Sequence, residues 1–161
     1  MYSKTTPRYE EPIDLMSVRL RILFVCESSR PCARFQSHLE REGCQLLVAA
    51  NAEKAVRSVL SAGYALDAVL LHDDDLARGS TIALLVKRIR PAMPVFLLTA
   101  TWPSTGALPM GVDALGYAPT LTRRVAHDIS GFVRRLLLDN SPHATGESIH
   151  RLLPRAPTYL N

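Results

Sequence analysis

The stretch Leu66-Asp-Ala-Val-Leu-Leu71 is a short apolar run that leads directly into the acidic segment His72-Asp-Asp-Asp75. A run of this length and composition is typical of a strand that is buried on both faces of a sheet. Similar apolar runs predict four further strands, at 19–25, 44–49, 95–99 and 114–117. Strands that are apolar almost throughout occur in parallel sheets, which helices cover on both sides.

The segments that separate these strands carry an apolar face at helical spacing. They predict helices over 31–43, 51–63, 81–90 and 122–139. With right-handed crossovers, the expected fold is an α/β flavodoxin-like three-layer sandwich with a five-stranded parallel sheet of order 2-1-3-4-5. In that order the carboxyl ends of strands 1 and 3 are neighbours, so we expect Cys26-Glu27 and His72-Asp73 to lie side by side.

The composition restricts the classes of function. A chain of 161 residues, 47% hydrophobic and 21% charged, predicts one soluble domain at 19–140, with a flexible leader at 1–18 and a polar tail at 141–161. No apolar run suits a membrane span or signal peptide, and three cysteines without a CxxC pair are typical of a reducing cytoplasm. The net charge of +4 comes mainly from scattered arginines without a base-reading motif, so neither nucleic acid nor membrane is an expected partner.

The residues at the ends of the predicted strands carry a family resemblance. The segment 19–139 resembles the receiver domains of two-component response regulators. In that family an acid pair after strand 1 holds Mg²⁺, and an aspartate after strand 3 is the nucleophile that accepts a phosphoryl group. A Thr or Ser at the end of strand 4 and the lysine of a Lys-Pro dipeptide after strand 5 meet the phosphoryl oxygens.

Three of these working groups are replaced in this chain. Cys26-Glu27 stands in place of the acid pair, His72 in place of the accepting aspartate, and Ala118-Pro119 in place of Lys-Pro, while Glu27 and Thr99 still match. The resemblance therefore implies a degenerate pseudo-receiver pocket with no catalytic residue, metal or cofactor. The pocket consists of Cys26, Glu27, His72, Asp73, Thr99 and Ala118.

The acidic segment leaves alternatives open. An active single-domain receiver would take its phosphoryl group on Asp73 or Asp74, but a one-residue shift from His72 turns the side chain to the other face of the strand unless the strand bulges. With Glu27 nearby, the segment also has oxygen ligands for a divalent cation. We favour aspartates that cap the turn and the next helix, and for Cys26 the role of a small buried residue rather than a redox-sensitive thiol.

A narrower resemblance lies within the same fold. Four segments resemble the N-terminal wing domain of bacterial ornithine/lysine/arginine decarboxylases: Asp67–Leu71, Arg88-Ile-Arg-Pro-Ala-Met-Pro-Val-Phe-Leu-Leu-Thr99, Ala107-Leu-Pro109 and Leu115-Gly-Tyr117. The last predicted helix, with Val125, Ala126 and Ile129, also resembles the last helix of that wing. That wing likewise lacks the phosphorylation residues, and a separate, larger domain holds pyridoxal phosphate through a lysine. The three lysines of this chain lie in the leader and on two predicted helices, so the resemblance implies a wing-like or accessory chain rather than an enzyme.

The expected function is therefore regulation or assembly through protein contacts. The expected partner is a second copy or another protein, including a pyridoxal-phosphate-dependent decarboxylase. The candidate surface comprises the last helix, the region of a short fourth helix, and strand 5. Trp102 is either a partner contact or a plug at the edge of the sheet. The candidate contact residues are Trp102, Arg123, Arg124, Arg134 and Arg135.

Overall fold

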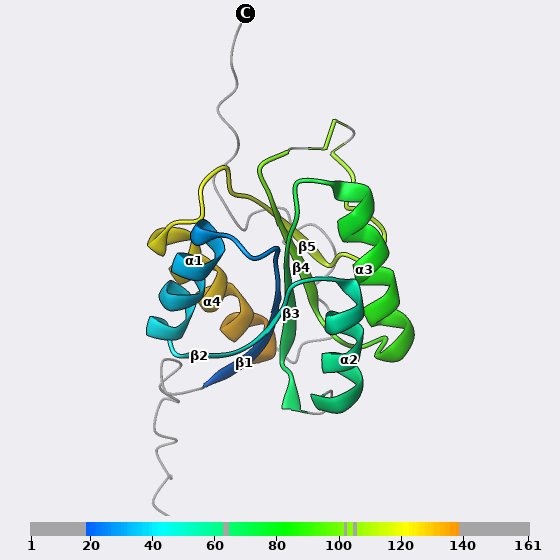
Figure 1. The fold of residues 1–161 in the computed structure, drawn as a ribbon, viewed down its shortest axis with the longest axis horizontal. Coiled ribbons are helices and arrows are strands. Elements are labelled where there is room, and N and C mark those ends of the chain that lie inside the picture. Colours follow the sequence, from blue (N-terminus) through cyan, green and yellow to red (C-terminus); the bar gives the residue numbers. More distant parts are fainter. Residues whose placement is uncertain (1–18, 63–64, 102, 105, 139–161) are drawn as a thin grey trace, which may run out of the picture.

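The computed structural model describes residues 19–62, 65–101, 103–104 and 106–138. The predicted leader, the predicted tail at 141–161 and Trp102 lie outside these described residues. The described residues form five strands and four helices (Figure 1).

All five strands belong to one sheet. Its order is β2-β1-β3-β4-β5, and every neighbouring pair is parallel. The predicted order 2-1-3-4-5 and the flavodoxin-like fold class are thereby confirmed. The strands are β1 (Leu20–Val25), β2 (Cys44–Ala49), β3 (Ala68–His72), β4 (Val95–Thr99) and β5 (Ala114–Tyr117).

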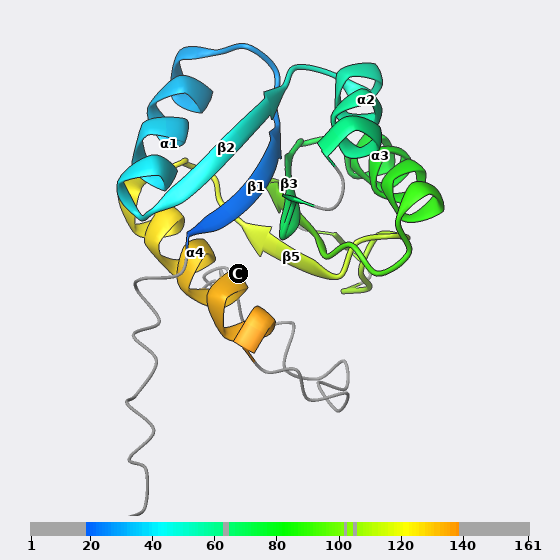
Figure 2. The same cartoon turned by 90° about the horizontal axis from the view of Figure 1, so that it is seen from below.

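Helices cover both faces of the sheet. Helices α1 and α4 lie on one face, and α2 and α3 lie on the other, as two perpendicular views show (Figures 1 and 2). The helices are α1 (Arg30–Arg41), α2 (Ala52–Ala62), α3 (Leu76–Ile89) and α4 (Arg123–Leu138). None of these four is long and apolar enough to cross a membrane.

Each face of the sheet has its own apolar layer. Under α1 and α4, Phe24 packs against Phe35 with ring centroids 5.7 Å apart, and Phe96 meets Phe132 edge-on at 5.5 Å. The layer under α2 and α3 is aliphatic. Successive strand residues enter opposite layers, so a strand in this sheet must be apolar at almost every position. This requirement explains why the strands are visible as continuous apolar runs in the sequence.

Helix α3 begins five residues earlier than the sequence predicts. It starts at Leu76 rather than at residue 81, because the Asp75 carboxylate accepts hydrogen bonds from the N–H groups of Ala77 and Arg78 and so caps the helix. Gly79 lets this added turn approach the sheet, since a Cβ there would lie 3.0 Å from Leu97 Cδ2. The earlier start carries Arg78 to the carboxyl end of the sheet.

The predicted region of a short fourth helix is a loop wherever the structure describes it between β4 and β5. Gly106 and Gly111 have φ angles of 65° and 80°, in the left-handed region that interrupts a right-handed helix. Pro103 and Pro109 lack the N–H group that a helix interior needs. The expected docking surface therefore has no helix from this segment.

Candidate functional site

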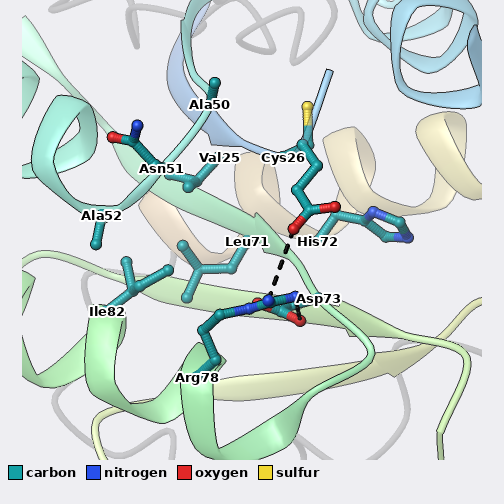
Figure 3. Close-up of a pocket in the computed structure, with 11 residues that line it drawn as sticks. Val25, Cys26, Ala50, Asn51, Ala52, Leu71, His72, Asp73, Arg78 and Ile82 are labelled. Atoms are coloured by element: carbon teal, nitrogen blue, oxygen red, sulfur yellow. Dashed lines mark hydrogen bonds and ion pairs between the residues drawn. The ribbon is translucent and has the colours of Figure 1, made fainter. Parts of the chain in front are cut away.

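A hollow of about 230 Å³ lies at the carboxyl ends of β1 and β3, beside the beginning of α2 and α3 (Figure 3). Ligands of open α/β sheets bind at this type of edge, where the order of the strands reverses. The structure brings Cys26-Glu27 and His72-Asp73 together here, as the strand order required. The lining residues are Val25, Cys26, Glu27, Ala50, Asn51, Ala52, Leu71, His72, Asp73, Arg78 and Ile82.

His72 and Asp73 point in different directions from the end of β3. His72 Nδ1 lies 3.8 Å from Cys32 Sγ on α1, whereas the Asp73 carboxylate faces Arg78 on α3. Figure 3 shows the imidazole turned away from the Asp73 and Arg78 pair. The imidazole of His72 is thus packed towards α1, and the nearest carboxylate, that of Asp73, faces the other helical layer.

Both carboxylate oxygens of Asp73 are occupied by Arg78. Arg78 Nε lies 2.5 Å from Oδ2 and Arg78 Nη2 lies 2.7 Å from Oδ1, while the N–H of Asp75 also donates to Oδ1 at 2.8 Å. Asp73 is only 8% exposed. Hydrogen bonding to this carboxylate raises the pKa of Arg78 above its ordinary value. The geometry is a two-point charged pair that closes one side of the hollow.

Sequence reasoning missed Arg78. It lies five residues after Asp73, and it reaches the carboxylate only because α3 starts at Leu76. The sequence would have predicted this contact if Asp75 had been taken as the N-cap of the helix, since that cap places Arg78 in the first turn. Arg78 Nη1 also lies 3.6 Å from Glu27 Oε1, so the carboxylate of Glu27 faces the same guanidinium group.

The other two aspartates of the acidic segment also have structural partners. Asp74 Oδ1 accepts a hydrogen bond of 2.7 Å from the N–H of Ala100, which ties the end of β3 to the end of β4. Asp75 caps α3. Among the described residues, no group of three His, Cys, Asp or Glu side chains is arranged to hold a metal ion. Through these hydrogen bonds the acidic segment caps α3 and fixes the turn that follows β3.

Thr99 and Ala118 lie at the ends of β4 and β5, as their positions in the sequence imply. Thr99 is fully buried, and its hydroxyl is engaged with the backbone of Thr101, whose N–H donates to Oγ1 at 3.0 Å. Ala118 is buried, and its N–H donates to the carbonyl oxygen of Thr99 at 2.8 Å. Ala118 thus presents only a methyl group at the end of β5, and neither it nor Thr99 lines the hollow.

Cys26 is a poor nucleophile in this setting. Burial, with a further contribution from neighbouring Cys32, raises the pKa of the Cys26 thiol to about 12. The neutral thiol predominates at physiological pH, and thiolate is the reactive form. Its sulfur lies 4.0 Å from Gln36 Nε2 inside the layer under α1. These properties suit a small packing residue.

Three of the four candidate arginines on α4 are exposed, and one is not. Arg123, Arg124 and Arg135 face solvent, whereas Arg134 is 4% exposed and its Nη2 donates to the carbonyl oxygen of Glu42. The expectation that Arg134 would meet a partner is wrong. It lies one turn after buried Ser130, on the side of α4 that packs against the end of α1.

The burial of His72 predicts that the free energy of unfolding depends on pH. Burial lowers the pKa of His72, an effect that the charges of Asp74 and Asp73 partly oppose. The unfolded chain then binds the proton more tightly than the folded one, so stability should fall as pH drops below about 6.5, by at most about 1.4 kcal/mol per pH unit for one proton. Urea unfolding of wild type and His72→Gln between pH 5 and 8 measures this. An equal slope in both proteins would contradict it.

The chain is similar to solved receiver structures. A CheY-like receiver domain protein from Methanospirillum hungatei is 20% identical, with 76% of this chain and 99% of that chain covered and a TM-score of 0.62. A two-component response regulator from Clostridium difficile is 19% identical, with 73% and 98% covered and a TM-score of 0.61. The N-terminal domain of a response regulator/sensory box/GGDEF protein from Carboxydothermus hydrogenoformans is 25% identical, with 74% and 98% covered and a TM-score of 0.58.

No protein-family model matches the chain, and no curated protein matches it. The likeness is therefore one of fold, at identities of 19–25% in these three structures. The chain has the fold of a response-regulator receiver domain. Its carboxyl-end hollow holds an internal Asp73–Arg78 pair.

Proposed function

We propose that this chain is a pseudo-receiver: a regulatory or assembly domain that accepts no phosphoryl group and acts through protein contacts. The observation that carries the proposal is the Asp73–Arg78 pair. It occupies both oxygens of the carboxylate nearest to the position of the receiver nucleophile, and that position itself holds His72.

The chemistry of phosphoryl transfer supports this proposal. Hydrogen bonds from a cation lower the nucleophilicity of an aspartate, and phosphoryl transfer needs a divalent cation and a further positive group to balance the charge on the phosphoryl oxygens. In this pocket Cys26 replaces one of the carboxylates expected to hold the cation, and Ala118 replaces the lysine. Arg78 carries a positive charge, but its hydrogen bonds are directed to Asp73.

A phosphodonor separates the pseudo-receiver from an active receiver. Incubation of the whole chain with acetyl phosphate and Mg²⁺ is expected to leave its mass unchanged, because no carboxylate at the hollow combines a free oxygen with a cation site. An active receiver domain in the same experiment serves as the control and should gain one phosphoryl group, about 80 Da. A gain of that mass by this chain, absent in Asp73→Asn or Asp74→Asn, would establish the active-receiver alternative.

The partner surface that we propose is the solvent side of α4, with the exposed arginines 123, 124 and 135. A surface of this charge favours an acidic partner. Reversing the charge at Arg123 and Arg124 together should weaken the complex and leave the fold intact. Pull-down of the partner by the double variant, compared with wild type, measures this effect, with circular dichroism as the check on folding. Full binding by the folded variant would place the contact elsewhere.

The decarboxylase resemblance supplies a specific candidate for the partner. The segments that carry it lie in β3, the end of α3, β4, the loop after β4, β5 and α4, so they run from the strand at the hollow towards the β5 edge of the sheet. Co-purification from source cells followed by mass spectrometry tests this candidate. Recovery of a pyridoxal-phosphate-dependent decarboxylase, lost with the α4 double variant, supports an accessory role. Recovery of a histidine kinase or another regulator supports a signalling role instead.

A further inference from the structure

Strand β2 forms one edge of the sheet, and no described strand lies beyond it. The N–H of Cys26 donates to the carbonyl oxygen of Ala49, so alternate β2 residues, Ala49, Leu47 and Gln45, direct their backbone groups towards β1. The intervening residues Leu46 and Val48 direct theirs outward. This edge therefore presents a row of backbone donors and acceptors to whatever lies beside it.

The side chains of β2 do not protect this edge. The strand, Cys-Gln-Leu-Leu-Val-Ala, contains no charged residue and no proline, which are the usual devices that keep an exposed edge from pairing. Leu47 is 43% exposed on the face of α2, and Val48 is 49% exposed on the face of α1. An apolar hollow of about 260 Å³ adjoins Leu47. Apolar surface is thus exposed on both faces of the same edge.

We propose that β2 pairs antiparallel with β2 of a second copy of this chain, joining two five-stranded sheets into one. A two-fold axis perpendicular to the sheet keeps each face on its own side, so a residue must oppose one of the same face. With the axis at Leu47, Leu46 opposes Val48 of the second copy, and the outward N–H and C=O groups of both residues meet as a hydrogen-bonded pair.

This register also matches the side chains. Leu47 opposes its own counterpart in a non-hydrogen-bonded position, where Cα atoms lie about 4.5 Å apart, and each leucine lies next to the apolar hollow of the other copy. On the other face Leu46 packs against Val48. These are apolar cross-strand pairs, which stabilise an antiparallel sheet. The register thus pairs the backbone groups and covers both exposed side chains at once.

Charge and shape around the edge fit a second copy. Glu40 borders the amino end of β2, and Ser37 and Ala33 lie on the same face of α1, one and two turns earlier. Antiparallel pairing sets α1 beside α1 of the second copy in the opposite direction. Glu40 then lies beside the beginning of that helix, where the N–H dipoles and Arg30 are positive. Small side chains between these ends leave room for the two helices.

Removal of one outward N–H tests the backbone pairing. The whole chain is expected to form a dimer that dissociates on dilution in sedimentation equilibrium. Val48→Pro deletes the Val48 N–H in both copies and should raise the dissociation constant at least about tenfold, whereas Val48→Thr keeps the N–H and the side-chain shape and should retain the dimer. A monomeric wild type, or a Val48→Pro protein that dimerises as well as wild type, would overturn the proposal.

A cross-link tests the register without relying on the proline variant. Leu47→Cys should form a symmetric disulfide dimer in a glutathione buffer, because the two Cα atoms face each other across the axis. Gln45→Cys is the matched control: its counterpart would lie roughly 14 Å away, beyond the about 7 Å limit for a disulfide. Equal cross-linking of both variants, or of neither, would show that the two edges do not meet in this register.

Discussion

Arg134→Glu is expected to lower the free energy of unfolding by about 3–5 kcal/mol, the range for a charge left buried without a partner. Arg134 is 4% exposed, and its guanidinium donates to the carbonyl oxygen of Glu42. A carboxylate in that place would have no proton to donate and would face an oxygen. The guanidinium also packs closely against Gly43, where a Cβ would lie 3.0 Å from Arg134 Nη2.

Arg123→Glu and Arg124→Glu are the matched controls for this result. Both residues are exposed on the same helix and undergo the same change of charge, so their effect on stability should stay within about 0.5 kcal/mol. Urea unfolding of the three variants and wild type at pH 7 measures the difference. If Arg134→Glu proved as stable as the other two, the contact with Glu42 would not hold the end of α1 against α4.

Asp73→Ala is expected to lower the free energy of unfolding by about 2–3 kcal/mol, because it removes charge-assisted hydrogen bonds from a buried carboxylate. The N–H of Asp75 loses its acceptor, and Arg78 loses the group that fixes its side chain at the hollow. A receiver nucleophile would behave differently, since a carboxylate kept free for reaction contributes little to the fold.

Asp74→Ala provides the comparison within the same acidic segment. Asp74 is exposed and accepts one hydrogen bond, from Ala100, so its loss should cost about 1 kcal/mol or less. Chemical unfolding of both variants, with the phosphodonor experiment repeated on each, separates the structural role from the reactive one. Equal stability of Asp73→Ala and wild type would mean that the Asp73–Arg78 pair does not contribute to the fold.

Of the six residues predicted for the pocket, Cys26, Glu27, His72 and Asp73 line the hollow, whereas Thr99 and Ala118 do not. Cys26, His72 and Thr99 each end a strand that is visible as an apolar run, and the sheet order follows from the crossover rules. The partner of Asp73 was not visible in the same way. It depends on the first turn of α3, and the helical pattern became clear only after Gly79, where the chain approaches the sheet.

For α4, too, the local pattern was predicted from the sequence, whereas a contact between distant residues was not. Its apolar residues at helical spacing identified the helix; of these, Ile129 and Val133 are buried and Phe132 is partly buried. Arg134 follows these residues and looks from its charge like a surface residue. Its burial is decided by the end of α1, 92 residues earlier in the chain, which supplies a carbonyl oxygen at the right place. A charged side chain can be buried when such a partner satisfies it.

Local patterns in the sequence were thus sufficient for the strands, the helices and their order, because apolar periodicity and short connections act between neighbours in the chain. They also predict which receiver groups are replaced, since those positions follow directly from strand ends. The pairing of Asp73 with Arg78, the burial of Arg134 and the exposed edge of β2 were decided by the tertiary structure. Each of these three features depends on which groups the packing brings together and on how far it excludes water from them. The spacing of residues along the chain encodes neither of these two conditions.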